Sequence, residues 1–463
     1  MGELKKKYGL FTAICMVVGI VIGSGIFFKA QDVLNETHGN SLTGVLAWVI
    51  GGLIMVSLAT TFSFMATKYS RVNGVVDYAE ATCGKGYAYY VGWFLSTIYY
   101  PAMTSVLAWV SARYTIVAVF GVSAVSEQAL FGPECITLAA FYLILMYFIN
   151  GIAPKFAGRL QVSTTVIKLI PIVFIALVGT VIGLANGTMA DNFTVMDTSS
   201  AADVGIRELF AAVCCTAFAY EGWIIATSIN AEIKDAKKNL PIALTIGTGI
   251  IVAAYVLYYV GVLGLERNDV LISEGTTAAF KYFGSAVATL INFLIIISCL
   301  GTLNGLMLGC TRGVYSLAAR DEGIAPDTFR QIDDKTNMPH NSAILALLLC
   351  GIWFVYFIGG QFFGWFGDYA FDSSELPIIT IYPLYVPIIV IFMKRERGIH
   401  PVKRFVIPSL ALAGSGLMVA ASIFRHEIAN VYYLIVFAVV MALGALVKYL
   451  NERRKHTSNK LSQ

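Results

Sequence analysis

The sequence predicts an all-α membrane protein with twelve transmembrane helices. Of its 463 residues, 57% are hydrophobic and 13% are charged, whereas a soluble domain carries about 25% charged residues. Apolar intervals near or above the ~20 residues that a helix needs to cross a bilayer recur along the whole chain. These intervals are 8–28, 42–67, 86–112, 136–154, 169–190 (preceded by a stretch from Gly158 that holds Lys168), 209–230, 240–265, 282–311, 342–367, 376–393, 405–424 and 428–447.

The distribution of Lys and Arg predicts how these spans are oriented. An even number of spans puts both ends of the chain on one side, and that side receives 25 of the 32 Lys and Arg residues. The other side receives six, Lys29 among them, and Lys168 is the only basic residue predicted well inside a span. Because cytoplasmic loops carry the excess of positive charge, the termini 1–7 and 451–463 are predicted to be cytoplasmic, in a plasma-membrane protein. No small-residue cleavage site follows the first span, which we therefore expect to be retained.

The composition argues against several other functions. The net charge of +4 reflects orientation and indicates no nucleic-acid partner. Eight scattered cysteines without a C-x-x-C pair are expected to be buried apolar residues. The five histidines lie in loops or at span ends, so no base or metal ligand is predicted at membrane depth. No phosphate-binding loop is present. We therefore predict no enzyme, no cofactor and no metal site, and nothing indicates a partner subunit.

Two spans carry residues that interrupt a helix at membrane depth. Span one contains Gly23-Ser24-Gly25 within "GIVIGSGIF", and glycine in a helix interior costs about 1 kcal/mol relative to alanine. Span six contains Phe218 to Trp223, with Glu221 and a glycine in its middle. The alternative reading of the first motif is that Gly19-x-x-x-Gly23 only lets a neighbouring helix approach closely.

The two interruptions occur at corresponding places in two halves of similar length. Spans one to five occupy 8–190 and spans six to ten occupy 206–394, and each first span is interrupted. Paired interruptions of this kind point to a transporter site at the bilayer midplane. Because five is odd, the second half is predicted to be inverted relative to the first, and spans eleven and twelve, 405–450, are appended.

Broken helices expose peptide groups that a zwitterion satisfies well. An unwound turn in lipid leaves amides and carbonyls unpaired at several kcal/mol each. The carboxylate of an amino acid accepts hydrogen bonds from amides near Ser24 and Gly25, at the positive end of a half-helix, and its ammonium donates to freed carbonyls. The predicted partners are amino acid substrates and the lipid bilayer.

Four stretches resemble the amino acid, polyamine and organocation (APC) superfamily, in particular its L-type amino acid transporter branch. They are "IGSGIF" (22–27), "QVSTTVIKLIPI" (161–172), "AFAYEGWIIATSINAEIKDAKKNLPIAL" (217–244) and "GTLNGLMLGCTRGVYSLAARDEGIAP" (301–326). The resemblance implies a LeuT-type fold with two inverted five-helix repeats plus two C-terminal helices, alternating access and amino acid substrates.

The resemblance also implies which residues form the site. The first break holds the substrate carboxylate, and the second break includes Phe218 as an outer gate, while Lys168 matches a family lysine that replaces a bound ion. The expected substrate-binding residues are Ile22, Gly23, Ser24, Gly25, Ile26, Phe218, Ala219, Tyr220 and Glu221, with Asn304 either contacting substrate or bonding a neighbouring helix.

Three functional readings stay open at this point. We expect an exchanger of small neutral amino acids such as Ser, Ala and Thr. An acidic residue at Glu221 also suits exchange of Lys, Arg or ornithine, with Glu221 as counter-charge. A third reading is a proton-coupled importer in which Lys168 titrates instead of acting as a fixed charge. The polar start of span ten, "DYAFDSSELP" at 368–377, has no assigned role.

Overall fold

The computed structural model describes residues 9–69, 74–120, 132–194, 204–227, 233–367 and 372–461, and within these ranges its regular elements are all helical. The predicted N-terminal segment 1–7 lies outside the described residues. The C-terminal segment from residue 451 continues the last helix as far as Leu461.

Eleven candidate membrane spans are present in the described part of the chain. Ten are helices long and apolar enough to cross a bilayer, and an eleventh is a helix pair bent by 48°. The ten are α3 (Ser41–Lys68), α5 with α6 (Lys85–Phe94 and Tyr100–Phe120), α8 (Pro133–Ile152), α9 with α10 (Pro154–Phe174 and Thr180–Asn186), α14 (Ala236–Leu265), α16 (Ser285–Ala318), α18 (His340–Phe362), α19 (Ile378–Arg395), α20 (Ile407–His426) and α21 (Ala429–Leu461). The bent pair is α1 (Leu10–Val21) and α2 (Gly25–Glu36).

The predicted sixth span corresponds to two shorter helices, α12 (Ile206–Tyr220) and α13 (Trp223–Thr227). The described part of α13 ends next to the undescribed residues 228–232, and the pair is not among the eleven spans. The count of twelve and the inverted-repeat arrangement therefore stay predictions. Smaller helices α4 (Val75–Cys83), α11 (Thr188–Thr194), α15 (Asn268–Glu274) and α17 (Pro326–Phe329) lie between the spans.

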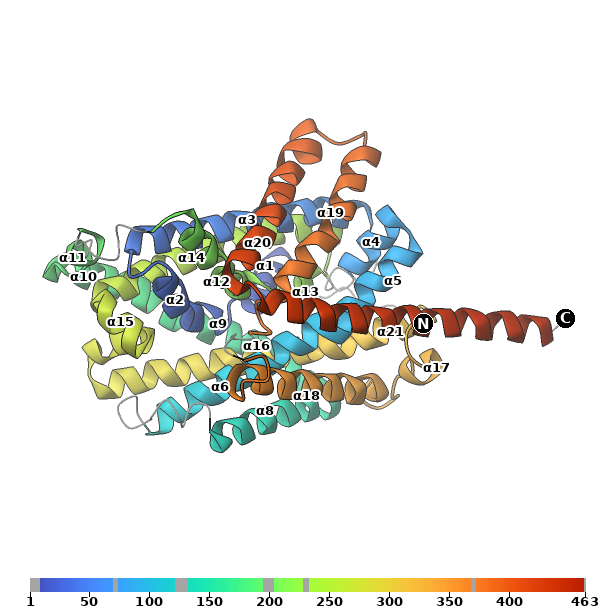
Figure 1. The fold of residues 1–463 in the computed structure, drawn as a ribbon, viewed down its shortest axis with the longest axis horizontal. Coiled ribbons are helices and arrows are strands. Elements are labelled where there is room, and N and C mark those ends of the chain that lie inside the picture. Colours follow the sequence, from blue (N-terminus) through green and yellow to red (C-terminus); the bar gives the residue numbers. More distant parts are fainter. Residues whose placement is uncertain are drawn as a thin grey trace.

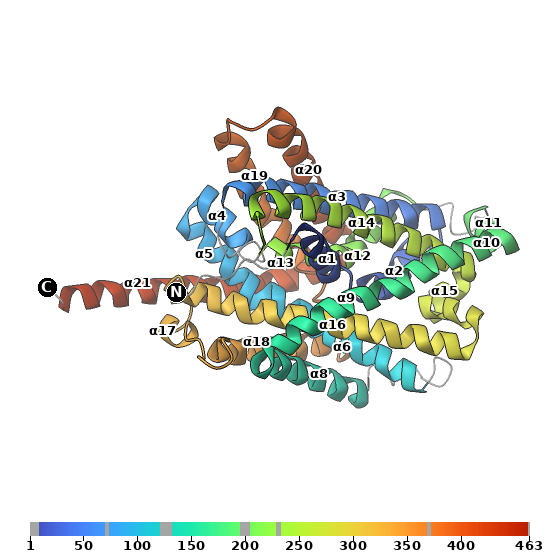
Figure 2. The ribbon, with the colours of Figure 1, turned by 180° about the vertical axis from the view of Figure 1, so that it is seen from behind.

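Most long helices run side by side along the long axis of the molecule (Figures 1 and 2). The pair α19 and α20 projects from the side of this bundle, and the C-terminal part of α21 extends beyond it (Figure 1). In the middle, α1 packs on α14 and α9, while α2 packs on α12. The two helix pairs with central breaks are thus enclosed by the other helices.

Both predicted helix breaks are confirmed. Ile22 ends α1 with extended backbone angles (φ −66°, ψ 111°), and α2 begins again at Gly25. In the sixth span Glu221 is extended (φ −72°, ψ 166°), and Gly222 has φ +105°, a left-handed value that side chains rarely adopt. The breaks touch one another, because a Cβ atom on Gly25 would lie 2.5 Å from Cα of Ala219.

Close packing accompanies the first break, so the two readings of the glycine motif are both correct. A Cβ atom on Gly19 would lie 2.0 Å from Oγ1 of Thr165 on α9, and one on Gly23 would lie 2.6 Å from Oγ1 of Thr302 on α16. Glycine at these positions lets α9 and α16 approach the broken helix closely.

The assignment of Lys29 to an outer loop is wrong. Lys29 lies within α2, its side chain is 1% exposed, and its ammonium contacts three carboxylates. Its Nζ atom lies 2.5 Å from Glu375, 2.7 Å from Asp372 and 3.2 Å from Asp32. Lys168 is therefore not the only buried basic residue. The polar segment before span ten now has a role, because Asp372 and Glu375 belong to it.

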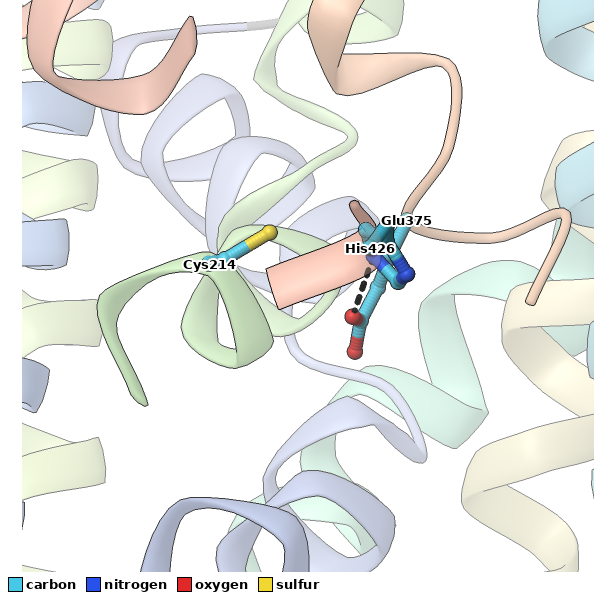
Figure 3. Close-up of side chains that lie close together, drawn as sticks. All are labelled: Cys214, Glu375 and His426. Carbon is cyan, nitrogen blue, oxygen red and sulfur yellow. Dashed lines mark ion pairs between the residues drawn. The ribbon is translucent and has the colours of Figure 1, made fainter. Parts of the chain in front are cut away.

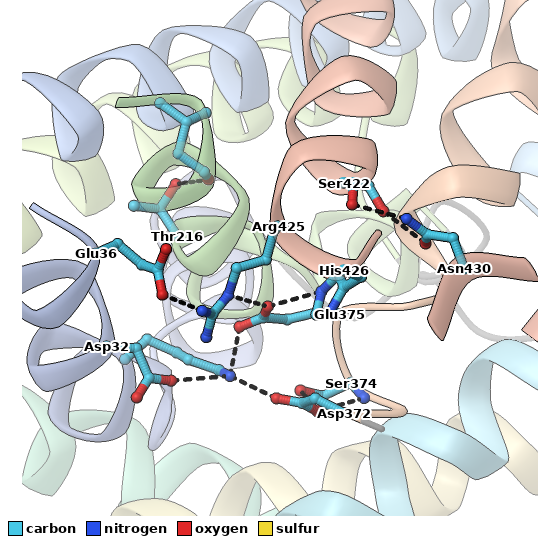
Figure 4. Close-up of polar contacts among 12 residues, drawn as sticks. Asp32, Glu36, Thr216, Asp372, Ser374, Glu375, Ser422, Arg425, His426 and Asn430 are labelled. Carbon is cyan, nitrogen blue, oxygen red and sulfur yellow. Dashed lines mark hydrogen bonds and ion pairs between the residues drawn. The ribbon is translucent and has the colours of Figure 1, made fainter. Parts of the chain in front are cut away.

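These charges are part of a larger group where α2, the segment before α19 and the end of α20 meet (Figure 4). Arg425 pairs with Glu36, and its Nε atom lies 3.6 Å from Oε2 of Glu375. His426 Nε2 lies 3.0 Å from the same oxygen. We call the set the ionic cluster; its members are Lys29, Asp32, Glu36, Asp372, Glu375, Arg425 and His426.

Candidate functional site

A cavity of about 30 Å³ lies between the two broken helices. Because one water molecule needs about 10–15 Å³ of such space, the cavity has room for two or three water molecules. Both breaks, α6 with the π-helical turn before it, and α16 surround the cavity. The lining residues are Ile20, Val21, Gly23, Ser24, Gly25, Tyr99, Met103, Leu107, Phe218, Glu221, Gly222, Thr302 and Leu306.

The start of α2 presents hydrogen-bond donors to this cavity. The first amides of a helix have no partner within that helix, and its N-terminus carries partial positive charge. Gly25 is the first residue of α2 and lines the cavity. The hydroxyl of Ser24 is buried at the same place, next to the thiol of Cys299. This end of the cavity is suited to a carboxylate.

Carbonyls freed by the two breaks share one tyrosine. The hydroxyl of Tyr255 on α14 lies 3.2 Å from the carbonyl oxygen of Val21 and 3.1 Å from that of Ala219. One hydroxyl proton cannot satisfy both acceptors at once. The oxygens therefore retain capacity for a further donor, such as an ammonium group.

Lys168 supports the first break from behind. Its side chain is fully buried, and its ammonium donates to the carbonyl oxygen of Gly19 at 2.9 Å and to Oγ1 of Thr302 at 2.8 Å. Gly19 precedes the break by one helical turn, and Thr302 lines the cavity. The lysine thus ties α9, α1 and α16 together immediately beside the site.

Glu221 lines the cavity, but its carboxylate is already engaged by tyrosines. The side chain is 8% exposed, and the hydroxyl of Tyr99 donates a hydrogen bond to Oε2. Tyr382 of α19 forms a second side-chain hydrogen bond to the same carboxylate. Tyr99 belongs to the π-helical stretch Leu95–Tyr99 between α5 and α6, and such stretches often occur at functional sites.

The residues predicted from sequence fall into three groups. Five line the cavity directly: Gly23, Ser24, Gly25, Phe218 and Glu221. Four lie in the breaks but do not line it: Ile22, Ile26, Ala219 and Tyr220. The hydroxyl of Tyr220 instead donates to the carbonyl oxygen of Trp48 on α3, at 2.8 Å. Lys168 stands behind the first break.

Asn304 is occupied by neighbouring helices. Its side-chain amide donates to the carbonyl oxygen of Ala157 on α9 at 3.2 Å and accepts from Asn150 on α8 at 3.0 Å. It does not line the cavity. Of its two predicted roles, this geometry favours bonding between helices.

Sequence reasoning did not identify Tyr99, Tyr255 and Thr302, although all three contact the breaks or Glu221. Each sits in an apolar span, where tyrosine and threonine are common. Only the π-helical turn distinguishes Tyr99, and a π-helix has no reliable sequence signal.

Comparison with known proteins shows which family the chain resembles. The family model described as amino acid permease matches residues 8–446. The serine/threonine exchanger SteT of Bacillus subtilis (strain 168) is 28% identical over 432 residues, which are 91% of this chain and 92% of SteT. The human b(0,+)-type amino acid transporter 1 is 24% identical over 440 residues, which are 94% and 86% of the two chains.

Among solved structures, MhsT in complex with L-phenylalanine matches with a TM-score of 0.54 at 15% identity, covering 95% of this chain and all of that one. This likeness extends to the fold, which is of the LeuT type. The chain is a multi-pass membrane transporter, not an enzyme, and it belongs to the amino acid permease family of the APC superfamily.

Proposed function

We propose that this protein exchanges small neutral amino acids across the plasma membrane by alternating access, with serine and threonine preferred over alanine. The observation that carries the choice of substrate is the engagement of Glu221 by two tyrosine hydroxyls. A carboxylate fixed in this way faces the cavity as an oriented acceptor. A substrate hydroxyl satisfies such an acceptor, whereas an alanine side chain leaves it without that bond.

The cationic alternative is less well supported by the same geometry. A lysine or arginine substrate needs Glu221 as its charge partner, whereas a hydroxyl needs only one acceptor position of a carboxylate that Tyr99 and Tyr382 already bond. A long side chain also needs room, and the cavity of about 30 Å³ requires the smallest rearrangement for the smallest substrate. The relative SteT is a serine/threonine exchanger, which supports the same choice.

The main chain of the two breaks is proposed to bind the part that all amino acids share. The substrate carboxylate accepts from amides around Ser24 and Gly25, with Ile22, Gly23 and Ile26 shaping that turn. The ammonium donates to carbonyls of the breaks, including that of Ala219. Phe218 covers the site as an outer gate, and Tyr220 positions the second break through its bond to Trp48.

Exchange is proposed over proton-coupled import on the premise that Lys168 acts as a fixed cation, although burial opposes its charge. Two short hydrogen bonds to Gly19 and Thr302 favour the charged amine. A lysine that stays protonated stabilises the first break throughout the transport cycle. No proton transfer then drives the substrate-free protein back across the membrane, so the protein returns with a second amino acid bound. The runner-up is an importer in which Lys168 releases its proton.

The arrangement in the membrane completes the proposal. We propose that both termini lie in the cytoplasm. Residues 8–190 and 206–394 form the two inverted repeats, and residues 405–450 form the appended pair of helices. The excess of Lys and Arg on the terminal side supports this orientation.

Reconstitution into vesicles tests the proposal. Vesicles preloaded with unlabelled serine should take up labelled serine, and empty vesicles should not. Unlabelled alanine should reduce the uptake of labelled serine less than unlabelled threonine does. Labelled arginine should not enter the vesicles. Equal uptake into empty and preloaded vesicles would contradict exchange, and faster uptake of arginine than of serine would establish the cationic alternative.

A further inference from the structure

Three potential metal ligands from separate parts of the chain lie close together (Figure 3), and two of them belong to the ionic cluster. They are Sγ of Cys214 on α12, a carboxylate oxygen of Glu375 before α19, and a ring nitrogen of His426 at the end of α20. All three donor atoms lie within 4.8 Å of one another. The sequence analysis predicted no metal site because these residues are far apart in the chain and no ligand spacing joins them.

Two of the ligands are buried and face each other, and Arg425 approaches the same carboxylate oxygen of Glu375. Oε2 of Glu375 and Nε2 of His426 are 3.0 Å apart, yet neither makes a hydrogen bond of good geometry within the described residues. The Glu375 side chain is fully buried and that of His426 is 6% exposed. A metal ion that bound both atoms would take the place of this single contact between them.

The charge balance around these atoms favours a cation. In the ionic cluster, the four carboxylates of Asp32, Glu36, Asp372 and Glu375 face two permanent cations, Lys29 and Arg425. The carboxylates outnumber these two permanent cations by two. Glu427, which follows His426 in the chain, pairs with Arg207 and adds no net charge.

The donor set selects the class of ion. Thiolate, imidazole and carboxylate together are typical ligands of zinc, which binds three protein ligands and leaves a fourth position for water. Hard ions such as magnesium and calcium prefer oxygen ligands alone. Ligands in a tetrahedral zinc site are closer together than 4.8 Å, so the Cys214 side chain has to move slightly inward.

We propose that Cys214, Glu375 and His426 bind a divalent metal ion of the zinc class and that this ion arrests transport. On binding, the thiol of Cys214 loses its proton to solvent, and water completes the coordination. The ion joins α12, the segment before α19 and the end of α20. Any step of the cycle that separates these elements is then slowed. Partly exposed Asp32, Glu36 and Arg425 connect the site with solvent.

The first readout does not depend on which substrate is transported. Zinc added to the purified full-length protein should raise its thermal unfolding temperature, with one zinc bound per chain. EDTA should remove the zinc and reverse the stabilisation. In Cys214→Ser and His426→Gln, the zinc concentration needed for half of the effect should rise at least about tenfold. Cys135→Ser and His38→Ala are the controls, because Cys135 is a buried cysteine on α8 outside the ionic cluster and His38 is exposed.

The second readout is exchange itself. Zinc on both faces of reconstituted vesicles should slow exchange of labelled serine by the wild type and both controls, but not by Cys214→Ser or His426→Gln. If one variant does not fold, the other carries the test. The proposal is overturned if zinc neither stabilises nor binds the wild type, if the ligand variants respond like the controls, or if zinc binds without slowing exchange. Failure of serine transport itself concerns the proposed function instead and leaves the thermal readout intact.

Discussion

Replacing Lys168 with methionine tests how the first break is held. Methionine has a similar length and no charge, so the change removes the hydrogen bonds to Gly19 and Thr302 without opening a large cavity. The carbonyl oxygen of Gly19 and the hydroxyl of Thr302 then lose their donor inside the membrane. We expect the first break to lose its fixed position, and substrate binding and exchange to weaken together.

The size of the effect follows from two opposing contributions. Each hydrogen bond to a charged group contributes about 1.5–3 kcal/mol, so losing two costs about 3–6 kcal/mol. Removing a buried ammonium relieves about 2.5–3.5 kcal/mol on membrane insertion scales. The midpoints of the two ranges leave a net loss of about 1.5 kcal/mol, and since 1.4 kcal/mol corresponds to tenfold, exchange should fall about tenfold.

The assay is exchange of labelled serine in preloaded vesicles, with the protein amount matched between variants. Lys281→Met, a change at an exposed lysine, is the control and should keep full activity. Thr302→Val removes only one of the two bonds and should have the smaller effect. Exchange by Lys168→Met at the wild-type rate would refute the supporting role. A proton gradient that drives serine into empty wild-type vesicles, but not into vesicles with the variant, would show that Lys168 titrates.

Three further predictions concern the same site. Glu221→Gln should slow serine exchange about tenfold, because the substrate hydroxyl loses a hydrogen bond to a charged group, and should change alanine exchange little. Competition between serine and alanine for exchange measures the difference. Gly25→Ala should destabilise the protein by about 1–3 kcal/mol through overpacking against Ala219, seen as a lower unfolding temperature, whereas Gly249→Ala, with nothing within 4 Å, should not. Tyr255→Phe removes the hydroxyl shared by both breaks and should lower the unfolding temperature and exchange. Tyr258→Phe is its control, because the Tyr258 hydroxyl has no hydrogen-bond partner among the described residues, so neither quantity should fall.

The sequence alone determined that the chain is a multi-pass helical membrane protein and where both helix breaks lie. Long uncharged intervals reflect the cost of charge in lipid, which acts on every span independently of its neighbours. Glycine at Gly23 and Gly25, and the Glu221-Gly222 pair in the sixth span, interrupt helices through local backbone preference. Such signals are local, so the predicted breaks appear in the structure within a residue or two.

The tertiary structure decided which side chains complete the site and how the charges are paired. Lys29 looked like a loop residue because the first apolar interval ends before it, yet the broken helix continues to Glu36. Its carboxylate partners, Asp372 and Glu375, lie more than 340 residues away in the chain. Tyr99 likewise reaches Glu221 across 122 residues. Pairings over such separations depend on how helices pack, and a burial that is costly for one charge becomes favourable only when the fold supplies its partner.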